Sequence, residues 1–566
     1  MILEGRLLRT FAAVFLTLGV LGACSDDDPP TGNSQVNPPS GLTVTALSAT
    51  STRVTFTAVS GASSYIVQRA TATGSFATVG SPTGTTFDDT GLDPNTQYRY
   101  QVATVQGTRT SAYTSPVTVT TSASGRFTAT LSAAAPISAS RTLFADTVYT
   151  LQGYVLVTNG ATLTIQPGTK IVGDYATPGS SLFVTRGSKI VAAGTAANPI
   201  VFTSSQPVGQ RKPGDWGGLV IVGNARINRN SGGTSIFTEG PTNARQDYAN
   251  GTLDNDNSGT LRYVRIEFAG YAETTNEELN SLSMYAVGRG TTIEYVQTMA
   301  GLDDSFEWFG GTVDGRYLVS YESGDDHFDW TEGYRGRNQF LIAFQSQQIP
   351  QRAGAGSLST DPNGFEGDGC ETNRPFCTTF AGSVPFSSPV FANFTVIGFG
   401  SAFTTSSGGY GAVIRRGAGV TLVNGILARW PRTGINIRDL ATDTLRQRDS
   451  VTIRNVLLVE NGANFDAPGG SNVFGQQANF AANSIVEPTG TAASLFVSLT
   501  PASFDWTPSA ASAARAGGLA TFTGTVAARI SGLFGGSGAI TGTSYVGAAD
   551  PAGPKWWEGW TVYITN

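Results

Sequence analysis

Apolar and polar positions alternate along residues 41–122 in short runs separated by turn residues, as in "TRVTFTAV" and "QYRYQVATV". A period of two is typical of strands that bury one face. From about residue 125 the runs stay short and rich in β-branched residues, and Gly makes up 70 of the 566 residues. Outside the extreme N-terminus, no long stretch repeats its apolar residues with a helical period. The pattern therefore predicts an all-β protein with two regions that differ in their arrangement of apolar and polar residues.

The first region, residues 41–123, resembles a fibronectin type III domain. The segment "GLDPNTQYRYQV" places Leu92, Pro94 and Tyr98 where that family has its tyrosine corner. The family's usual early Trp is absent, and Phe56 is the candidate to replace it. The resemblance implies a small β-sandwich. No acids or aromatic residues are arranged for chemistry in it, so we expect a spacer.

The second region, residues 124–566, repeats itself. The segment "ATLTIQPGTKIVG" at 161–173 returns 19 residues later as "SSLFVTRGSKIVA" at 180–192. Short strands at a period near 20 predict a parallel β-solenoid, because one coil cannot bury its inner face alone and stacked coils share a core. At about 22 residues per coil, we expect some fifteen coils once the long loops near 225–260 and 346–390 are allowed for.

Several motifs in this region resemble secreted and lipid-anchored right-handed parallel β-helix proteins of Gram-negative bacteria, a pectate-lyase-like solenoid group. They are "LTIQPGTKI", "GTAANPIVFTS", "GDWGGLVIVGNA", "DNSGTLRYVRIEFAG", "DDSFEWFGGTV" and the closing "WWEGWTVYITN". Most of that group have no assigned activity. The resemblance implies a fold and a location much more than a function.

The N-terminus predicts a lipoprotein signal peptide over residues 1–23. Two arginines precede a short apolar run that ends in "LGAC", which resembles the lipobox of bacterial lipoproteins and makes Cys24 the acylated residue. Residues 24–40 are polar and read as a disordered tether. "CSDDD" also resembles the signal that sends some lipoproteins to the outer face of the outer membrane. We therefore expect a lipid-anchored protein that faces the cell exterior.

The composition and the cysteine spacing limit the partners, disulfides and cofactors that can be expected. The net charge is −6 and no basic run occurs, so no nucleic-acid partner is expected. With Cys24 lipidated, Cys370 and Cys377 are left, seven residues apart, which suits a disulfide in an oxidising compartment. The only His is too far away to make a metal site with them. No motif predicts an organic cofactor.

Acidic residues cluster in one repeated motif. "DDSFEW" at 303–308 returns as "DDHFDW" at 325–330, one coil later, and "NGFEGD" at 363–368 is a third copy. Aligning the Phe residues places Glu307, Asp329 and Glu366 in one column, and Asp304, Asp326 and Asn363 in another. With Phe inward, the first column becomes an external ladder, with Ser305 and His327 on the same face.

Stacked carboxylates repel each other by roughly 1 kcal/mol per pair in water and by about 3–4 kcal/mol at an effective dielectric near 20. A hard cation such as Ca²⁺, the arginines Arg316, Arg335 and Arg337, or a raised pKa could offset this repulsion. Alternatively, the acids cap turns by accepting backbone N–H groups. The predicted metal ligands are Asp304, Glu307, Asp326, Asp329 and Glu366. His327 and the three arginines are predicted binding residues.

A second candidate cation loop is "DNDNSG" at 254–259, which supplies Asp254 and Asp256. Arg265 stands where an EF-hand loop needs a bidentate Glu, so the loop is either a weaker Ca²⁺ site or an Asx-turn.

Two classes of function remain. A non-catalytic adhesin or binder of glycans or surface proteins is favoured, because the signature motifs of polygalacturonases and of Ser or Cys hydrolases are missing. A polysaccharide lyase or hydrolase that uses the acidic ladder is the alternative. Trp308 and Trp330 could stack on sugar rings, but their parity with Phe306 and Phe328 predicts that they lie in the core.

Overall fold

The computed structural model describes residues 36–122, 127–274, 277–370, 375–377, 382–405, 407–465, 483–501, 503–531 and 539–563. The predicted signal peptide and Cys24 lie outside these residues. The chain divides into two compact units, residues 1–124 and residues 125–566, each of which is described by itself.

The first unit is an antiparallel β-sandwich, as predicted. One sheet has the order β1-β2-β5, and the other contains β4, β3, β6 and β7, with β8 also paired to β6. The strands are β1 (Ser40–Ala46), β2 (Ser51–Thr57), β3 (Ser64–Thr71), β4 (Ala77–Gly80), β5 (Thr86–Thr90), β6 (Gln97–Gln106), β7 (Arg109–Thr110) and β8 (Val117–Thr120). Phe56 is buried in the core, and Tyr98 Oη accepts the Asp93 N–H at 3.0 Å. The tyrosine corner is therefore present.

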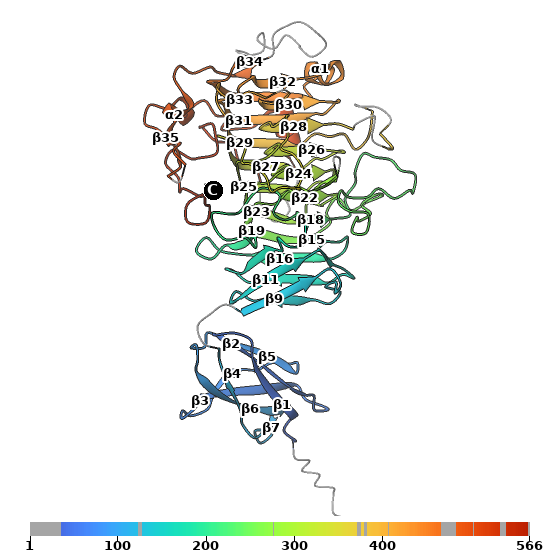
Figure 1. The fold of residues 1–566 in the computed structure, drawn as a ribbon, viewed down its shortest axis with the longest axis vertical. Helices are drawn as coiled ribbons and strands as arrows, with labels where there is room; N and C mark the ends of the chain where they lie inside the picture. Colours follow the sequence, from blue (N-terminus) through green and yellow to red (C-terminus); the bar gives the residue numbers. More distant parts are fainter. Residues whose placement is uncertain are drawn as a thin grey trace, which may run out of the picture. The chain divides into compact units, whose positions relative to one another are not determined.

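The second unit is a parallel β-helix whose strands stack along one axis (Figure 1). Fourteen described strands form its long sheet. They are β9 (Phe127–Ser132), β10 (Arg141–Leu143), β11 (Thr147–Gln152), β13 (Thr162–Ile165), β14 (Lys170–Gly173), β16 (Lys189–Ala193), β17 (Ile200–Ser204), β19 (Gly259–Glu267), β23 (Thr292–Met299), β25 (Asp314–Tyr321), β27 (Arg337–Phe344), β29 (Val390–Ile397), β31 (Val420–Ala428) and β33 (Val451–Val459).

A second parallel sheet forms another wall of the coils and has ten described strands. They are β12 (Tyr154–Val157), β15 (Ser181–Val184), β18 (Gly218–Val222), β22 (Leu282–Tyr285), β24 (Phe306–Phe309), β26 (Phe328–Thr331), β28 (Phe365–Asp368), β30 (Tyr410–Arg415), β32 (Thr433–Ile437) and β34 (Ala463–Phe465). Long connections separate β18 from β19 and β27 from β29, close to the predicted loops. One continuous apolar core runs between the walls.

The long sheet bends at the same position on successive rungs. Tyr263, Tyr295, Tyr317 and Phe340 have φ between 48° and 64°, a left-handed conformation that costs a bulky residue free energy. Their rings stack with centroids 4.4, 4.4 and 5.1 Å apart, and this packing offsets part of the cost. On the next three rungs the bend is occupied by asparagines, which tolerate this conformation better: Asn393, Asn424 and Asn455.

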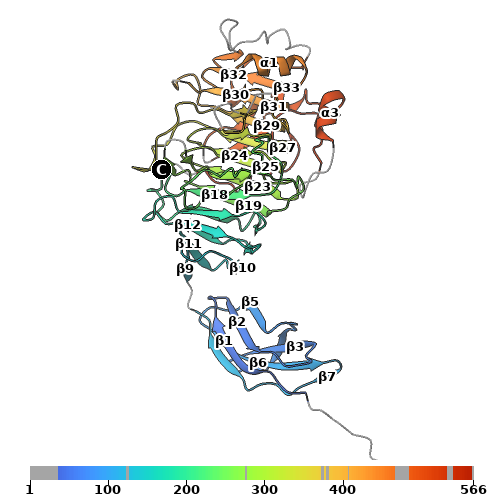
Figure 2. The ribbon, with the colours of Figure 1, turned by 90° about the vertical axis from the view of Figure 1, so that its right-hand side faces the viewer.

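Among the described residues, the C-terminal segment adds no strand to the two large sheets. The sequence predicted β-helix as far as residue 566, but the last described strands of the two large sheets are β33 and β34. Val486 makes an isolated parallel bridge to Leu457 of β33, and from residue 492 the described chain runs back beside the coils (Figure 2). Trp556 packs on Tyr317, Trp560 on Tyr295, and the Val562 N–H donates to Gln297 at 3.0 Å. The segment therefore covers the bend column.

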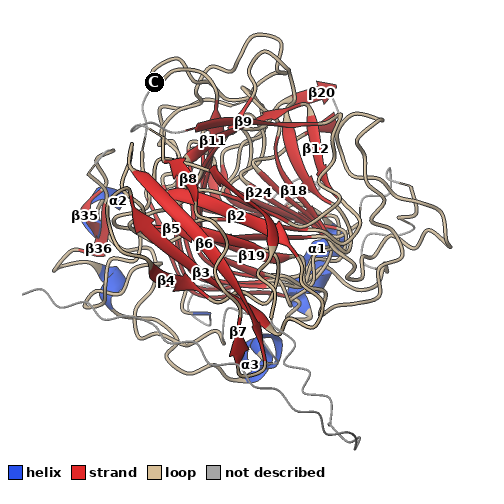
Figure 3. Ribbon diagram, turned by 90° about the horizontal axis from the view of Figure 1, so that it is seen from below, coloured by secondary structure: helices blue, strands red, loops and turns tan. Residues whose placement is uncertain are grey.

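The remaining elements are short, and strands dominate the regular structure (Figure 3). They are β20 (Ala272–Thr274), β21 (Glu277–Glu278), α1 (Leu440–Gln447), α2 (Ala492–Leu495), β35 (Phe496–Ser498), β36 (Asp505–Pro508), the 3-10 helix η3 (Ala513–Arg515) and α3 (Gly524–Ile530). Among the described residues, no helix has the length and apolar character needed to cross a bilayer.

Candidate metal site

The three copies of the acidic motif lie on consecutive rungs in the predicted register. Phe306 pairs with Phe328 and Phe328 with Phe365, which puts Glu307, Asp329 and Glu366 side by side on β24, β26 and β28. The Phe rings stack inside the core with centroids 5.6 and 5.3 Å apart. Apolar stacking on the inside thus holds the three carboxylates together on the outside.

Trp308 and Trp330 lie in the core, as their parity predicted. Their exposed fractions are 1% and 0%. The Trp308 ring stacks on Tyr334 at 5.0 Å, and the Trp330 ring contacts Phe391 at 5.1 Å. Neither ring is therefore available to a sugar.

The ladder faces out of the coil but is largely shielded from solvent, with Asp329 half-buried, which corrects the expectation of an external ladder. Glu307 and Glu366 are each only 8% exposed. The connection after β18 folds over this wall, where Ile236 and Tyr248 pack against the outward side chains of β22 and β24. The carboxylates are thus held in a partly dehydrated environment, in which their repulsion is stronger than in water.

The second acidic column caps the backbone. The side-chain oxygen of each member accepts the backbone N–H of the next residue in the column. The distances are 3.1 Å from Asp304 N to Asn280, 2.8 Å from Asp326 N to Asp304, 2.5 Å from Asn363 N to Asp326 and 3.1 Å from Tyr410 N to Asn363. The turn-capping alternative is therefore correct for one oxygen each of Asp304 and Asp326. Asn280 extends this column and was not predicted.

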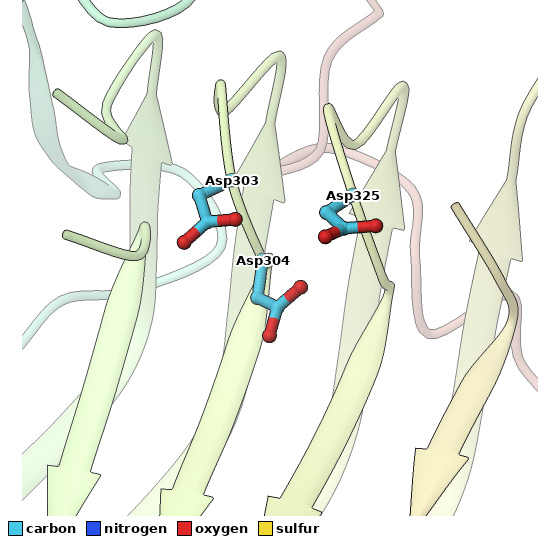
Figure 4. Close-up of side chains that lie close together, drawn as sticks. All are labelled: Asp303, Asp304 and Asp325. Atoms are coloured by element: carbon cyan, nitrogen blue, oxygen red, sulfur yellow. The ribbon is translucent and has the colours of Figure 1, made fainter. Parts of the chain in front are cut away.

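The two columns converge on three overlapping carboxylate triads. In each triad one oxygen per residue lies within 4.8 Å of the others. Figure 4 shows the first, in which Asp303 and Asp304 approach Asp325 from the neighbouring rung. The triads are Asp303–Asp304–Asp325, Asp304–Glu307–Asp329 and Asp326–Asp329–Glu366. All five acids of the repeated motif that were predicted as metal ligands belong to a triad. Asp303 and Asp325, which were not predicted, also belong to one.

Burial and mutual repulsion shift the protonation of these acids. Burial, reinforced by neighbouring carboxylates, raises the pKa of Asp303, Asp304, Asp325 and Asp326 well above the ordinary aspartate range. Burial also raises the pKa of Glu366, which Arg415 partly opposes. For Asp329 the pKa rises to about 8, chiefly through burial and then through Asp368. Without a further cation, the cluster therefore holds protons at neutral pH.

The cation beside the ladder is Arg415, which the sequence analysis missed. Its guanidinium donates to Glu366 and, at 2.9 Å, to Asp368. The arginines that were predicted here bind elsewhere, which corrects that prediction. Arg316 donates to Gln339 and the Ala539 carbonyl, Arg335 to Asp254, and Arg337 to Asp314 and the Ser531 carbonyl.

Ser305 and His327 face the interior and not the ladder, which corrects their predicted orientation. They precede their strands, where strand alternation does not apply. Ser320 Oγ, on β25, lies 2.7 Å from Ser305 Oγ and 2.5 Å from His327 Nδ1. His327 is 1% exposed, and burial lowers its pKa to about 3, so the ring is neutral.

The second candidate loop is occupied by protein cations. Asp254 pairs with Arg226 and, at 3.2 Å, with Arg335, and these arginines help to lower its pKa to about 2 against the opposing effect of burial. Asp256 accepts from the Ser258 hydroxyl at 3.0 Å. Among the described residues, neither aspartate belongs to a carboxylate triad. This geometry fits the Asx-turn alternative better than a Ca²⁺ site.

The triads fit a hard cation. Their donors are all carboxylate oxygens, the ligands that Ca²⁺ prefers, and two oxygens on opposite sides of a Ca²⁺ ion lie about 5 Å apart. Asp325 Oδ1 and Asp329 Oδ1 are buried and have no hydrogen-bond partner among the described residues. Asp325 and Asp329 belong to different triads, so a cation in each would give both carboxylates a partner and reduce the repulsion.

Cys370 and Cys377 form a disulfide, as predicted. The bond closes the connection that follows β28. The Gly369 carbonyl, next to the bridge, accepts from Asn228 at 3.1 Å. The disulfide thus lies where this connection meets the loop after β18.

Comparisons with known proteins agree with both units. A pectate-lyase-like β-helix domain model matches residues 135–498, and a fibronectin type III model matches residues 37–120. No curated protein matches significantly. Among solved structures, domains A168–A170 of titin are 24% identical, with a TM-score of 0.15, over 16% of this chain and 32% of that one. An Fn3-like protein from Clostridium thermocellum is 28% identical, with a TM-score of 0.14, over 15% of this chain and 92% of that one. The match thus spans about a third of the titin chain.

Proposed function

The chain belongs to the pectate-lyase-like β-helix family, and from this premise we propose that its β-helix binds Ca²⁺ along the acidic ladder and serves as a cell-surface module that binds glycans or partner proteins. The observation that carries the proposal is the set of three overlapping carboxylate triads on adjacent rungs. Arg415 is the one arginine within salt-bridge distance of Glu366 among the described residues.

The energetics favour a cation over bare carboxylates. Two ionised carboxylates about 4.8 Å apart repel each other by roughly 3.5 kcal/mol at an effective dielectric near 20. Protonation relieves this repulsion only where the pKa of an acid is raised above the ambient pH. Asp329, with a pKa of about 8, is such an acid and carries a proton at neutral pH. Divalent ions in the triads relieve the repulsion while the carboxylates stay ionised, and they supply partners to the carboxylates of Asp325 and Asp329.

Removing divalent ions should destabilise the β-helix. A ligand at a hundred times its Kd stabilises the folded state by about 2.7 kcal/mol. We expect EDTA to lower a thermal transition, millimolar Ca²⁺ to restore it, and the pair Asp329→Asn and Glu307→Gln to abolish the response. Because solenoids can melt in parts, circular dichroism should be combined with hydrogen exchange at β24, β26 and β28.

A matched control separates this site from nonspecific calcium effects. Asp254 is also an aspartate in an acidic motif, but it is paired with two arginines. Asp254→Asn should keep the full response to EDTA and Ca²⁺. An unchanged transition in EDTA, with no Ca²⁺ bound in equilibrium dialysis, would reject the cation site.

Anchoring at Cys24 completes the proposed function. The support is the charged N-terminal region, the short apolar run and "LGAC". Cys24→Ala should convert a membrane-fractionating protein into an unprocessed or soluble form, measured by detergent partitioning and intact mass. Ser25→Ala is the control and should stay anchored. Outer-membrane fractionation of Cys24→Ala at the wild-type level would contradict lipidation.

A polysaccharide lyase or hydrolase remains the second candidate because of Asp329. With a pKa of about 8 it is protonated at neutral pH, as a general acid must be. However, the triad oxygens lie within 4.8 Å of one another, whereas inverting hydrolases separate their carboxyls by about 6.5–9.5 Å. Ca²⁺-dependent cleavage of polygalacturonate that Asp329→Asn abolishes would favour the enzyme over the binding module.

A further inference from the structure

A recess of about 380 Å³ opens where the connection after β18 meets the connection after β28. The first connection lines it with residues 226–230 and 250–251, and the second with residues 376 and 382–385. None of these residues belongs to a carboxylate triad. The recess is therefore separate from the candidate metal site.

Hydrogen bonds on the buried side of the recess hold the two connections together. The Asn228 N–H donates to the Glu332 carbonyl at 2.8 Å, and Asn228 Nδ2 donates to the Gly369 carbonyl at 3.1 Å. Arg229 donates to the Pro375 carbonyl at 3.1 Å and to the Glu332 carboxylate at 2.7 Å. Asn228 and Arg229 are both buried. Because these contacts set the shape of the recess in advance, a ligand loses less free energy to ordering the protein.

Two asparagine amides in the lining have unused donors. Asn230 Oδ1 accepts the Gly232 N–H at 3.3 Å, and Asn250 Oδ1 accepts the Ser231 hydroxyl at 3.3 Å. Each carbonyl is thus used within the connection, which orients the amide. Neither Nδ2 group makes a hydrogen bond with the described residues. Asn230 and Asn250 are both exposed, so a ligand in the recess can accept from them.

The charged side chains of the lining are paired with acids, so the recess selects a neutral ligand. Arg229 pairs with Glu332. Arg226 donates from Nε and NH2 to Asp254, and its NH1 makes no hydrogen bond with the described residues. With 56% of its side chain exposed, Arg226 can donate one further hydrogen bond from NH1. The guanidinium therefore acts here as a third donor and not as an uncompensated charge.

Apolar side chains complete the lining. Val384 is 74% exposed, the Phe376 ring is half-buried, and Ile227 and Pro385 lie beside them. The recess thus combines a small apolar surface with three donors. A ligand that fits it has an apolar face and several oxygen acceptors.

We infer that this recess binds one neutral sugar unit of a glycan, with the C–H face of the sugar ring against Phe376 and Val384. The sugar oxygens accept from the amides of Asn230 and Asn250 and from Arg226 NH1. The volume lies within the range of small-molecule sites, and an apolar lining with a few placed polar groups is typical of them. The inference rests on the glycan-binding part of the proposed function, for which it names a site and a class of sugar. It does not depend on Ca²⁺ at the acidic ladder.

The test is ligand-observed NMR titration of the full chain at pH 6 in EDTA, so that no cation on the acidic ladder can hold a sugar. The probes are the methyl glycosides of D-glucose, D-galactose and N-acetyl-D-glucosamine, with D-glucuronate and glycerol for comparison. We expect at least one neutral sugar to bind at millimolar concentration or tighter. Glucuronate should bind no more tightly, and glycerol should not bind because it has no ring face. Asn230→Ala should weaken sugar binding about fivefold through the lost donor, and Phe376→Leu should weaken it through the lost flat ring.

Asn243→Ala is the matched control. Asn243 is an exposed asparagine on the same connection but does not line the recess, so this variant should bind sugars like wild type. Wild-type affinity in both Asn230→Ala and Phe376→Leu would overturn this site and leave a glycan-binding function in place. Absence of binding by all three neutral sugars, equal binding of glycerol, or tighter binding of glucuronate would overturn the inference. None of these results bears on the cation site, which the thermal response to EDTA and Ca²⁺ tests by itself.

Discussion

In EDTA, the stability of the β-helix should fall as the pH rises from about 4 to about 8. Asp329 has a pKa of about 8 in the folded protein, against an ordinary value of 3.8. Between these two values the folded state binds more protons than the unfolded state, so raising the pH favours unfolding. The pKa values of Asp303, Asp304, Asp325 and Asp326 are raised in the same direction and add to the loss.

This prediction has a large expected magnitude. Each unit by which the folded pKa exceeds the unfolded one contributes about 1.4 kcal/mol, so several acids together should strongly lower the free energy of unfolding of the cation-free β-helix at pH 8 relative to pH 4.5. The free energy of unfolding should be measured by urea denaturation at pH 4.5, 6 and 8 in EDTA. Millimolar Ca²⁺ should flatten the dependence, because the ion binds the ionised carboxylates that the higher pH produces.

Two variants test the origin of the pH dependence. Asp329→Asn should reduce the slope, because the amide does not titrate. Asp550→Asn changes an exposed aspartate on the C-terminal segment and should leave the slope unchanged. Stability that stays constant or increases with pH in EDTA would mean that the ladder is not a cluster of strained carboxylates.

The rung register was predictable because closely similar motifs occupy equivalent positions on neighbouring coils. "DDSFEW" and "DDHFDW" are one coil apart, and the stacking of Phe306 on Phe328 aligns every other position with them. The core positions of Trp308 and Trp330 followed from the same alternation. These properties depend only on local spacing and on the period of a strand.

The surroundings of the ladder were not predictable in this way. Arg316, Arg335 and Arg337 are near the motif in sequence, but a coil turns through more than one wall, so neighbours in sequence face different directions. Arg415, by contrast, lies 49 residues after Glu366, beyond a long connection with no repeat to mark it. The loop that covers the ladder is also far from the acidic motif in sequence, since Tyr248 belongs to the connection after β18. Burial of the carboxylates is therefore a property of the assembled coils.

Replacing Arg415 by Met should lower the free energy of unfolding by about 3–5 kcal/mol at pH 8 in EDTA, because removing one partner leaves buried charges unpaired. Arg415 donates to both Glu366 and Asp368, with only 14% of its side chain exposed. The stability of Arg415→Lys should lie between that of wild type and that of Arg415→Met, because an ammonium keeps the charge but not the fork of donors. Urea denaturation combined with hydrogen exchange at β28 and β30 provides the measurement.

The control is Arg262→Met, since Arg262 has a side chain 50% exposed and lies 3.8 Å from Glu294. That change should stay within about 0.5 kcal/mol of wild type. Adding Ca²⁺ then tests whether Arg415 stabilises the ladder through its charge or through its hydrogen-bond geometry. If positive charge is what the ladder needs, Ca²⁺ should restore much of the stability of Arg415→Met, since the ion binds the same carboxylates. A loss below 1 kcal/mol in Arg415→Met would show instead that Glu366, whose pKa is raised, is neutralised by protonation and that the guanidinium contributes little.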